Sequence, residues 1–414
     1  MNCMKLASLV VLLLIHSALA TDGPKKDFHE IEVPDEMNVA QRDNKFATEL
    51  YARLRSGHPG NLFFSPFSVS TALAMPYAGA NGPTRQEMAK VLHVSAPEQN
   101  FYYAHYVLQK RLSADDETPA FQLRIANRLW GRNDLGIHPP FAQFLRHVYG
   151  VGLVELDFQQ TETARQTINS WVEKQTDRRI QELISPGVLS ADTPLVLANA
   201  IYFKATWVQE FLPGNTQDAA FHVSAVQQIK VPTMFAEQNA RYVGSLDIQV
   251  LELPYQGRSR LSMLILLPKS RDGLSDLENR LTSENLQKWT SGLRSRTVKV
   301  HLPRFKMTSE FRLTDMLAAM GMPLAFSEQA DFSVMSAQKP LFISNVIHKA
   351  FVDVNEEGTE AAAVTALEAT KSAPEEEESD RPVEFRADHP FLFLIRDNRT
   401  ETILFLGRLL DPGT

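Results

Sequence analysis

Residues 351–369 read FVDVNEEGTEAAAVTALEA, and the character of the chain changes within this stretch. Phe351 to Asn355 alternate apolar and polar residues, as a strand does. The following residues lack a large apolar face, and a strand pattern returns only at 390–395 (PFLFLI). A connection of about thirty residues between two strands is far longer than the usual ~4 to 6 and is commonly functional. We therefore expect an exposed, protease-accessible loop over about residues 356–387.

The first half of this loop is also compatible with a strand. Residues two apart share one face of an extended chain, and here all but one of them are small: Thr359, Ala361, Ala363, Thr365, Leu367 and Ala369. Such a face can be buried in a sheet without steric conflict. A flexible alanine-rich linker would have the same composition, so both interpretations stay open at this point.

Composition places the chain among ordinary globular proteins. It has 414 residues, of which 44% are hydrophobic and 22% charged, so it can bury a large core. The net charge is -7 and Lys and Arg are scattered, which argues against a nucleic-acid partner.

The N-terminus has the pattern of a secretory signal peptide. Lys5 precedes an apolar stretch from Leu6 to Ile15, and the small residues Ala18 and Ala20 precede Thr21. We expect residues 1–20 to be removed, 21–38 to form a flexible leader, and 39–414 to form a single domain. Cys3 is the only cysteine and would leave with the signal, so the secreted protein would have no disulfide. It would also have no membrane span.

Periodicity elsewhere indicates an α+β fold. Phe46, Leu50 and Leu54 recur four apart as on a helix that ends at Gly57, and helical spacing recurs at 168–172 and 180–184. Strand-like runs occupy 195–203, 249–255, 261–267 and 298–305. Helices come first and strands later, without regular alternation, which favours antiparallel or mixed sheets.

Several separated motifs, in order along nearly the whole chain, together resemble the serpin family. The segment 356–363 (EEGTEAAA) resembles the hinge of inhibitory serpins: Glu356, Glu357, Gly358, Thr359, Glu360, Ala361, Ala362 and Ala363. Residues 61–68 (NLFFSPFS), 77–84 (YAGANGPT), 197–207 (LANAIYFKATW), 388–393 (DHPFLF) and 404–407 (LFLG) are similar to other family motifs. The resemblance implies a serpin fold with a large central sheet, about nine helices and an exposed reactive-centre loop. Pro76 departs from the family pattern and should kink or end its helix.

The resemblance also implies roles for residues at matching positions. Four residues would form a polar "shutter" beneath the centre of the main sheet: Ser65, Ser68, Asn199 and His348. Three would form the "breach" where the loop enters the sheet: Trp207, Arg304 and Glu356. Arg304 and Glu356 would form an exposed ion pair that positions the hinge and contributes only ~0 to 1 kcal/mol. His348 alone is otherwise a structural histidine, and Trp207 alone a core residue.

The implied mechanism is suicide inhibition of a serine protease. The metastable inhibitor is cleaved in its loop, the acyl-enzyme is trapped covalently, and the hinge inserts into the central sheet. Family spacing places the scissile bond between Ser372 and Ala373, which suits an elastase-like protease. Cleavage between Lys371 and Ser372 would suit a trypsin-like one, and Arg381 is a weaker choice. The acidic run Glu375 to Glu378 lengthens the loop, so counts from its two ends disagree.

Two other functions stay open. A non-inhibitory serpin with a carrier, chaperone or storage role would keep the fold, although the small hinge residues argue against it. A hydrolase is disfavoured because the sequence has no Gly-x-Ser-x-Gly or His-Glu-x-x-His motif. We expect no catalytic residues, no metal and no cofactor, and we expect a monomer. Lys110 and Arg111 leave a small basic site for an activator, and Asn398-Arg399-Thr400 is a glycosylation sequon.

Overall fold

The computed structural model describes residues 36–94, 98–114, 121–257, 261–338, 340–359 and 381–413. The predicted signal peptide, nearly all of the predicted leader and residues 360–380 of the predicted loop lie outside these ranges. The first described helix begins at Glu36, within the last residues assigned to the leader.

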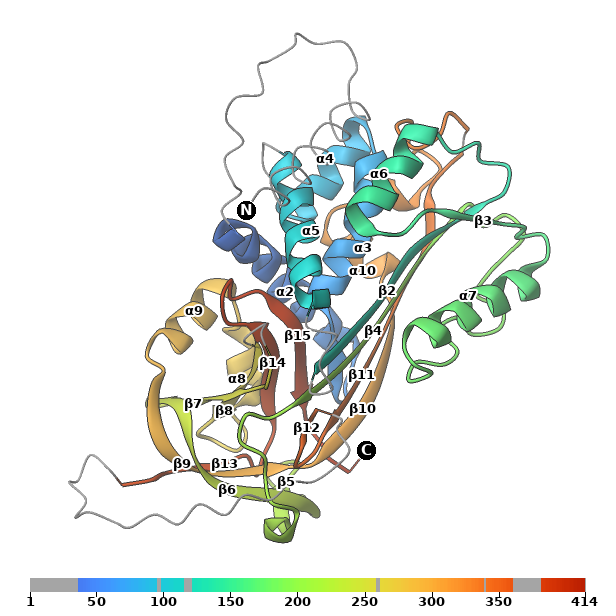
Figure 1. Cartoon of the computed structure of the whole chain (residues 1–414). Coiled ribbons are helices and arrows are strands. Elements are labelled where there is room, and N and C mark those ends of the chain that lie inside the picture. The colour runs from blue at the N-terminus through green and yellow to red at the C-terminus, as the bar shows by residue number, and fades with distance from the viewer. Residues whose placement is uncertain are drawn as a thin grey trace.

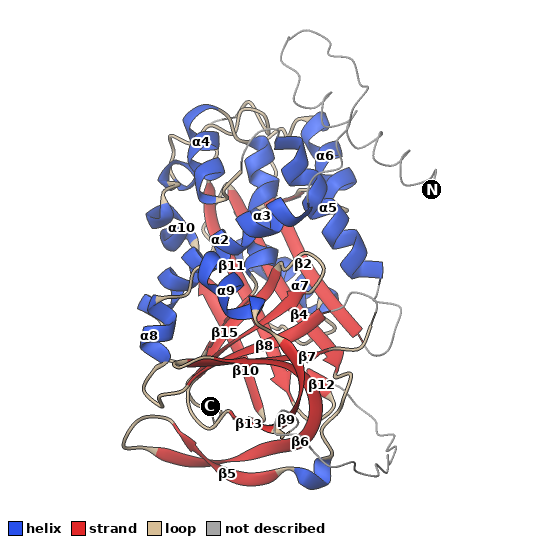
Figure 2. Cartoon of the chain, turned by 90° about the vertical axis from the view of Figure 1, so that its left-hand side faces the viewer, coloured by secondary structure: helices blue, strands red, loops and turns tan. Residues whose placement is uncertain are grey.

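Nine α-helices occur in the described residues, as expected. They are α2 (Glu36–Gly57), α3 (Pro66–Gly79), α4 (Gly82–Val91), α5 (Glu98–Ala114), α6 (Pro139–Tyr149), α7 (Thr161–Gln175), α8 (Leu274–Asn279), α9 (Ser283–Ser291) and α10 (Thr314–Met320), with 3-10 turns at Pro213–Asn215 and Pro323–Phe326. Most helices gather at one end of the molecule and the sheets extend to the other (Figure 2).

The strands form two mixed sheets. The larger has the order β1-β15-β14-β8-β7-β6-β9-β13, with β5 paired to β6, and the other has the order β10-β11-β12-β4-β2-β3. Their bounds are β1 (Leu62–Phe64), β2 (Phe121–Arg132), β3 (Val154–Leu156), β4 (Leu195–Thr206), β5 (Gln217–His222), β6 (Gln228–Gly244), β7 (Ile248–Pro254), β8 (Leu261–Pro268), β9 (Arg294–Pro303), β10 (Phe305–Arg312), β11 (Ile343–Val354), β12 (Gly358–Thr359), β13 (Val383–Arg386), β14 (Phe391–Asp397) and β15 (Ile403–Leu409).

The centre of the six-stranded sheet is buried on both faces, whereas its edge strand β10 exposes alternate residues. One face packs on α7, where Ile168 and Val172 meet Ala198 and Ala200 of β4. The other face of β4 carries Ile201, Phe203 and Ala205 into a core shared with β8 and β14. Figure 1 shows α7 alone on one side of β2 and β4, with α2, α3 and α5 on the opposite side. Alternate residues of β4 therefore face different cores, which explains its continuous apolar sequence.

Two local expectations need correction. Of the kink or end expected at Pro76, the end is wrong, because the helix α3 continues to Gly79. The helical spacing at 180–184 does not give a helix, because the chain there is irregular and has positive φ at Asp177, Arg178 and Glu182. Ile180, Leu183 and Ile184 are nevertheless fully buried beside α7. They are apolar because this irregular segment packs against α7, and not because it forms a helix.

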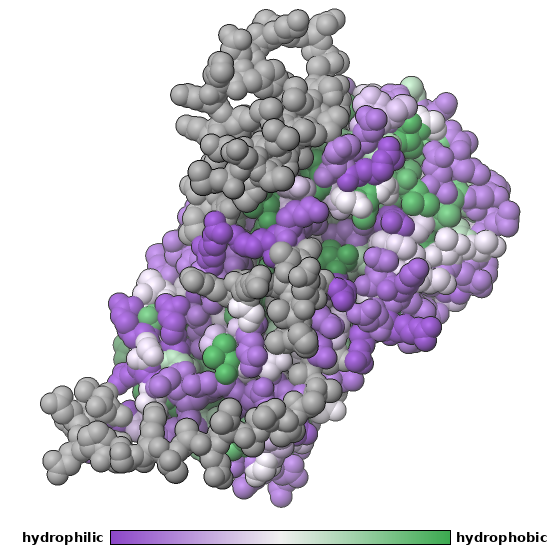
Figure 3. Space-filling model, viewed as in Figure 1, coloured by the Kyte–Doolittle hydropathy of each residue, from purple (hydrophilic) through white to green (hydrophobic). Residues whose placement is uncertain are grey.

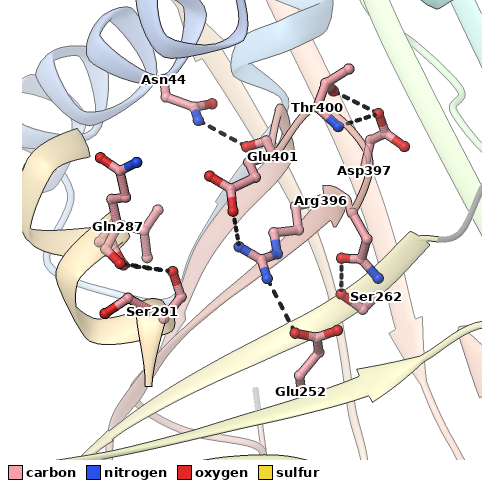
Figure 4. A network of polar contacts seen from close by, with 12 residues as sticks. Asn44, Glu252, Ser262, Gln287, Ser291, Arg396, Asp397, Thr400 and Glu401 are labelled. Atoms are coloured by element: carbon pink, nitrogen blue, oxygen red, sulfur yellow. Dashed lines mark hydrogen bonds and ion pairs between the residues drawn. The ribbon is translucent and has the colours of Figure 1, made fainter. Parts of the chain in front are cut away.

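A buried ion network fixes the turn between β14 and β15. Arg396 donates to Glu252 over 3.1 Å and lies 3.9 Å from Glu401, while Asn44 of α2 donates to the Glu401 carbonyl over 2.8 Å (Figure 4). The sequon residue Asn398 accepts a hydrogen bond of 2.7 Å from Ser262 in the same region.

Candidate functional site

The short strand β12 lies between two strands of the central sheet. Gly358 pairs antiparallel with Thr206 of β4, while Thr359 pairs with Ala205 of β4 on one side and with Val354 of β11 on the other. Further along the sheet, β4 and β11 pair directly and in parallel, from Leu195 with Ile343 to Tyr202 with Phe351. The loop's first two strand residues thus already separate β4 from β11, and the sheet is closed beyond them.

Several contacts hold the start of this loop against β4. The backbone N–H of Trp207 donates to the Glu357 carbonyl over 2.9 Å, and its indole Nε1 donates to the Asn355 carbonyl over 3.0 Å. The Trp207 ring stacks on Tyr255 at 4.5 Å, and the Tyr255 hydroxyl lies 2.8 Å from the Thr359 hydroxyl. Gly358 has φ of 154°, and a Cβ there would collide with the Ala205 carbonyl oxygen, so only glycine fits so close to β4.

The Glu356 carboxylate binds two side chains. Arg304 donates to it through Nε over 2.6 Å and through its terminal nitrogen, and Thr216 donates through its hydroxyl. Burial by itself raises the pKa of Glu356, but these hydrogen bonds outweigh it and the net pKa is lowered. The expectation of an exposed pair is wrong for Glu356, whose side chain is 6% exposed, although Arg304 is 44% exposed. Trp207, Arg304 and Glu356 therefore lie in one cluster, which we call the breach cluster.

The four residues expected in the shutter also lie together, where the centre of the sheet meets the start of α3. The Ser65 N–H donates to Nε2 of His348 over 3.0 Å, and Nδ1 of His348 contacts Oδ1 of Asn199. Asn199 Nδ2 donates to the Ser68 hydroxyl over 2.7 Å and also to Asn127 of β2. We call these five residues the shutter cluster. Its hydrogen bonds link β11, β4, β2 and the start of α3, so parting β4 from β11 must rearrange them.

His348 is neutral in this cluster. It is fully buried, and desolvation lowers its pKa to about 3. Since Nε2 accepts from the Ser65 N–H, the ring proton is on Nδ1 and is donated to the Asn199 carbonyl oxygen. No catalytic role follows from this arrangement.

Sequence reasoning missed three residues that belong to these clusters or contact the start of the loop. Asn127 is a polar residue on the face of β2 that carries Leu123, Ile125 and Leu129, so an isolated polar residue on an apolar face was the available signal. Thr216 and Tyr255 carry no such signal, because only the fold brings them to Glu356 and Thr359.

The rest of the expected site is not described. The hinge residues Glu360 to Ala363 and the candidate bonds at Lys371, Ser372 and Ala373 lie outside the described residues. Chain that is described resumes at Arg381, and β13 then pairs in parallel with β9 of the larger sheet. Both ends of the 356–387 segment are therefore anchored, in different sheets.

Two other kinds of feature are absent from the described part of the chain. No group of three or more His, Cys, Asp or Glu residues is placed to hold a metal ion there. No helix within those ranges is long and apolar enough to cross a membrane.

Comparison with known proteins decides the family. The family model described as Serpin (serine protease inhibitor) matches residues 41–412. The chain belongs to the serpin family. This serpin is 42% identical over 388 residues to a leukocyte elastase inhibitor of Sus scrofa, covering 90% of this chain and 99% of the relative.

Solved structures agree on the fold of this serpin. Uncleaved ovalbumin matches with a TM-score of 0.81 at 31% identity, covering 90% of this chain and all of that one. Human thyroxine-binding globulin matches with a TM-score of 0.82 at 30% identity, covering 91% and 99%. The expected family and the expected α+β serpin fold are thus confirmed.

Proposed function

We propose that this serpin inhibits a serine protease as a suicide substrate, by inserting its cleaved loop between β4 and β11. The position of β12 carries this proposal. It already occupies the site of an added strand, antiparallel to β4, and the loop needs only to continue in the same register.

The register of β12 specifies which residues the inserted loop would place on each core. If pairing continues from Thr359 with Ala205, then Ala361 reaches Phe203, Ala363 reaches Ile201 and Thr365 reaches Asn199. Residues paired across a ladder point to the same face. The small residues of the loop would therefore enter the tightly packed core beneath β4, and Thr365 would meet the shutter cluster.

The shutter cluster suits such a change of partners. Its serine hydroxyls, amides and imidazole each can exchange hydrogen bonds, so a threonine that arrives opposite Asn199 can replace the hydrogen bonds that break when β11 moves away. The buried polar groups of the shutter cluster then need not remain without hydrogen-bond partners in the open sheet.

The chemistry belongs to the protease. Its serine oxygen bonds to the Ser372 carbonyl carbon, the peptide bond to Ala373 breaks, and the protease histidine gives a proton to the released amine. Insertion then drags the ester-linked protease away and disturbs the geometry on which hydrolysis by water depends. Lys371 with Ser372 is the alternative bond. A relative named as a leukocyte elastase inhibitor, together with a small Ser372, favours an elastase-like target.

We also infer that the protein is exported. The signal-like residues 1–20 precede the family match, which begins at residue 41, and the relative from Sus scrofa spans only 90% of this chain. N-terminal sequencing of protein made in a eukaryotic host should begin at Thr21. A start at Met1, or retention in the cell, would reject export.

A carrier function is the second candidate, because the fold is shared with a protein named for binding thyroxine. The fold alone therefore does not establish inhibition. The loop and the breach cluster are the features that favour inhibition over a carrier function. One experiment separates the two functions.

The test is to incubate the protein with elastase-like and trypsin-like serine proteases and to analyse denaturing gels and peptide masses. We expect a complex that survives boiling, with a released peptide that begins at Ala373. Thr365→Arg should be cleaved without complex, because the guanidinium would enter the shutter cluster, whereas Thr365→Ala keeps a small side chain and should still trap. Clean cleavage of the unaltered protein across the panel would reject inhibition.

A further inference from the structure

Three arginines lie on the face of β2 that packs toward α7. Arg124, Arg128 and Arg132 are four residues apart in the strand, so their side chains share this face. Arg124 contacts Asp177 over 3.2 Å, and Arg132 contacts Asp134 over 2.6 Å. Among the described residues, Arg128 in the middle has no carboxylate partner. The row therefore carries one cation that no ion pair neutralises.

Two indole rings hold the Arg128 guanidinium in place. Its Cζ lies 4.3 Å from the ring centroid of Trp171 in α7 and 5.4 Å from that of Trp130 in β2. The two indoles are 5.5 Å apart and nearly perpendicular. Attraction to an aromatic ring stabilises the positive charge but supplies no oxygen acceptor for the five N–H donors of an arginine.

The donors of Arg128 have no acceptor in the described ranges. Its Nε is buried without a hydrogen-bond partner, and its terminal nitrogens also lack one but remain accessible, since the side chain is half-buried. Burial lowers the pKa of Arg128 from 12.5, and the side chain is still charged at neutral pH. Three other arginines that are largely buried each bind a carboxylate: Arg111, Arg396 and Arg408. A partly desolvated cation without an oxygen acceptor favours an anionic group at its accessible end.

Apolar residues lie on the same face of the sheet. Strand β3 pairs in parallel with the end of β2, so Val154 and Leu156 face α7 as Trp130 does. Both are only half-buried, and so is Trp171. Figure 3 shows hydrophobic residues around β3 beside strongly hydrophilic ones over α7. The cation of Arg128 is thus accompanied by apolar surface that water reaches.

We propose that Arg128 binds the carboxylate of a small organic acid whose apolar part lies against Trp171 and β3. The carboxylate accepts two N–H bonds from the terminal nitrogens, and these charge-assisted bonds are strengthened beside rings that exclude water. A monoanion suits the site better than a phosphate dianion, because the neighbouring arginines are already paired and one cation balances one negative charge. This inference does not depend on protease inhibition.

The binding test uses benzoate and its uncharged counterpart benzamide with the full-length secreted protein, measured by isothermal titration calorimetry. We expect saturable binding of benzoate that Arg128→Met weakens about tenfold, because methionine can still contact the indoles but removes the charge-assisted hydrogen bonds. Arg132→Met removes the same charge from the same face and should leave the affinity unchanged. No saturable binding of benzoate, or equal affinities for the two variants, would overturn the proposal.

A second test locates the ligand in the unaltered protein, by NMR of protein that carries isotope-labelled arginine. The Nε–H signal of Arg128 is identified as the one that Arg128→Met lacks. We expect benzoate to shift this signal saturably, with the dissociation constant found by calorimetry, and benzamide to leave it in place. Shifts of other arginine signals without a shift of this one would place the ligand elsewhere and overturn the site.

Discussion

The buried neutral His348 should make the closed fold less stable in mild acid. Desolvation lowers its pKa to about 3 in the folded protein, against about 6.5 in an unfolded chain. Between these values the unfolded state binds a proton that the folded state does not, so the free energy of unfolding falls as pH falls. At pH 5 the loss is about 2 kcal/mol, from 1.36 kcal/mol for each of the ~1.5 units between 6.5 and 5.

Another buried histidine acts with the opposite sign. Burial lowers the pKa of His105, but the Asp43 carboxylate and hydrogen bonds outweigh it and the net pKa is raised. Its contribution to the free energy of unfolding is fully present below about pH 6.5 and is lost as pH rises through the raised pKa of His105. The unaltered protein shows both effects together, so a variant is needed to isolate His348.

The assay compares thermal unfolding at pH 7.5 and pH 5.0 for the unaltered protein and for His348→Gln. With ~2.1 cal/mol/K of unfolding entropy per residue, 2 kcal/mol corresponds to roughly 2–3 °C. We expect the acid-induced drop in Tm to be smaller by that amount in His348→Gln, while the exposed His147→Gln serves as control. Equal drops in the unaltered protein and His348→Gln would refute the assignment of a neutral native His348.

Three further outcomes are expected. Glu252→Gln removes the carboxylate from the buried Arg396 and should cost about 3–5 kcal/mol in urea unfolding; a cost below 1 kcal/mol would show that the pair is not needed. Arg304→Met deprives Glu356 of its cation and should lower the free energy of unfolding by about 1–2 kcal/mol at pH 7. Because the pKa of Glu356 is lowered, this loss is present above about pH 4.5 and should vanish in more acidic buffer. A loss that does not depend on pH would contradict this expectation. Gly358→Ala places a Cβ against the Ala205 carbonyl and should displace β12, detected as faster amide exchange at Thr359; unchanged exchange would reject the steric argument.

Local patterns were enough for much of the fold. Alternation predicted the end of β11 from Phe351, the strand-like run at 390–395 predicted β14, helical spacing predicted α2 up to Gly57, and the change of character at 356 predicted where the loop begins. They failed at 180–184, because a burial pattern set by docking beside α7 has the same spacing as a helix face. Periodicity reports which side chains are buried and does not report the backbone path that buries them.

The site required more than local pattern. Ser65 and His348 are 283 residues apart, and nothing in either segment predicts that one donates to the other. The family resemblance brought them together in advance, yet it did not supply Asn127, which the structure adds from β2. Hydrogen-bond partners across a sheet depend on strand order and register, which a single sequence does not encode locally.

If the loop inserts as proposed, the register of the sheet also explains why cleavage should trigger insertion. Full insertion in the β12 register brings Ala369 opposite Leu195, at the far end of the 12-residue β4, about 36 Å from Thr206. In an uncleaved chain, residues 370–382 would then have to return along that length to β13, and thirteen residues span at most about 43–47 Å. An intact tether would have to extend over most of its maximum length, so its entropic cost would oppose insertion until a cut at the proposed Ser372 bond releases the end. The ladder from Leu195 to Tyr202 and the shutter cluster add a second barrier, which the cut leaves in place and which the arriving strand must displace residue by residue. Lengthening the loop by residues after Ala373 should therefore speed spontaneous insertion without cleavage, whereas weakening the shutter cluster should speed insertion in both the cut and the uncut protein.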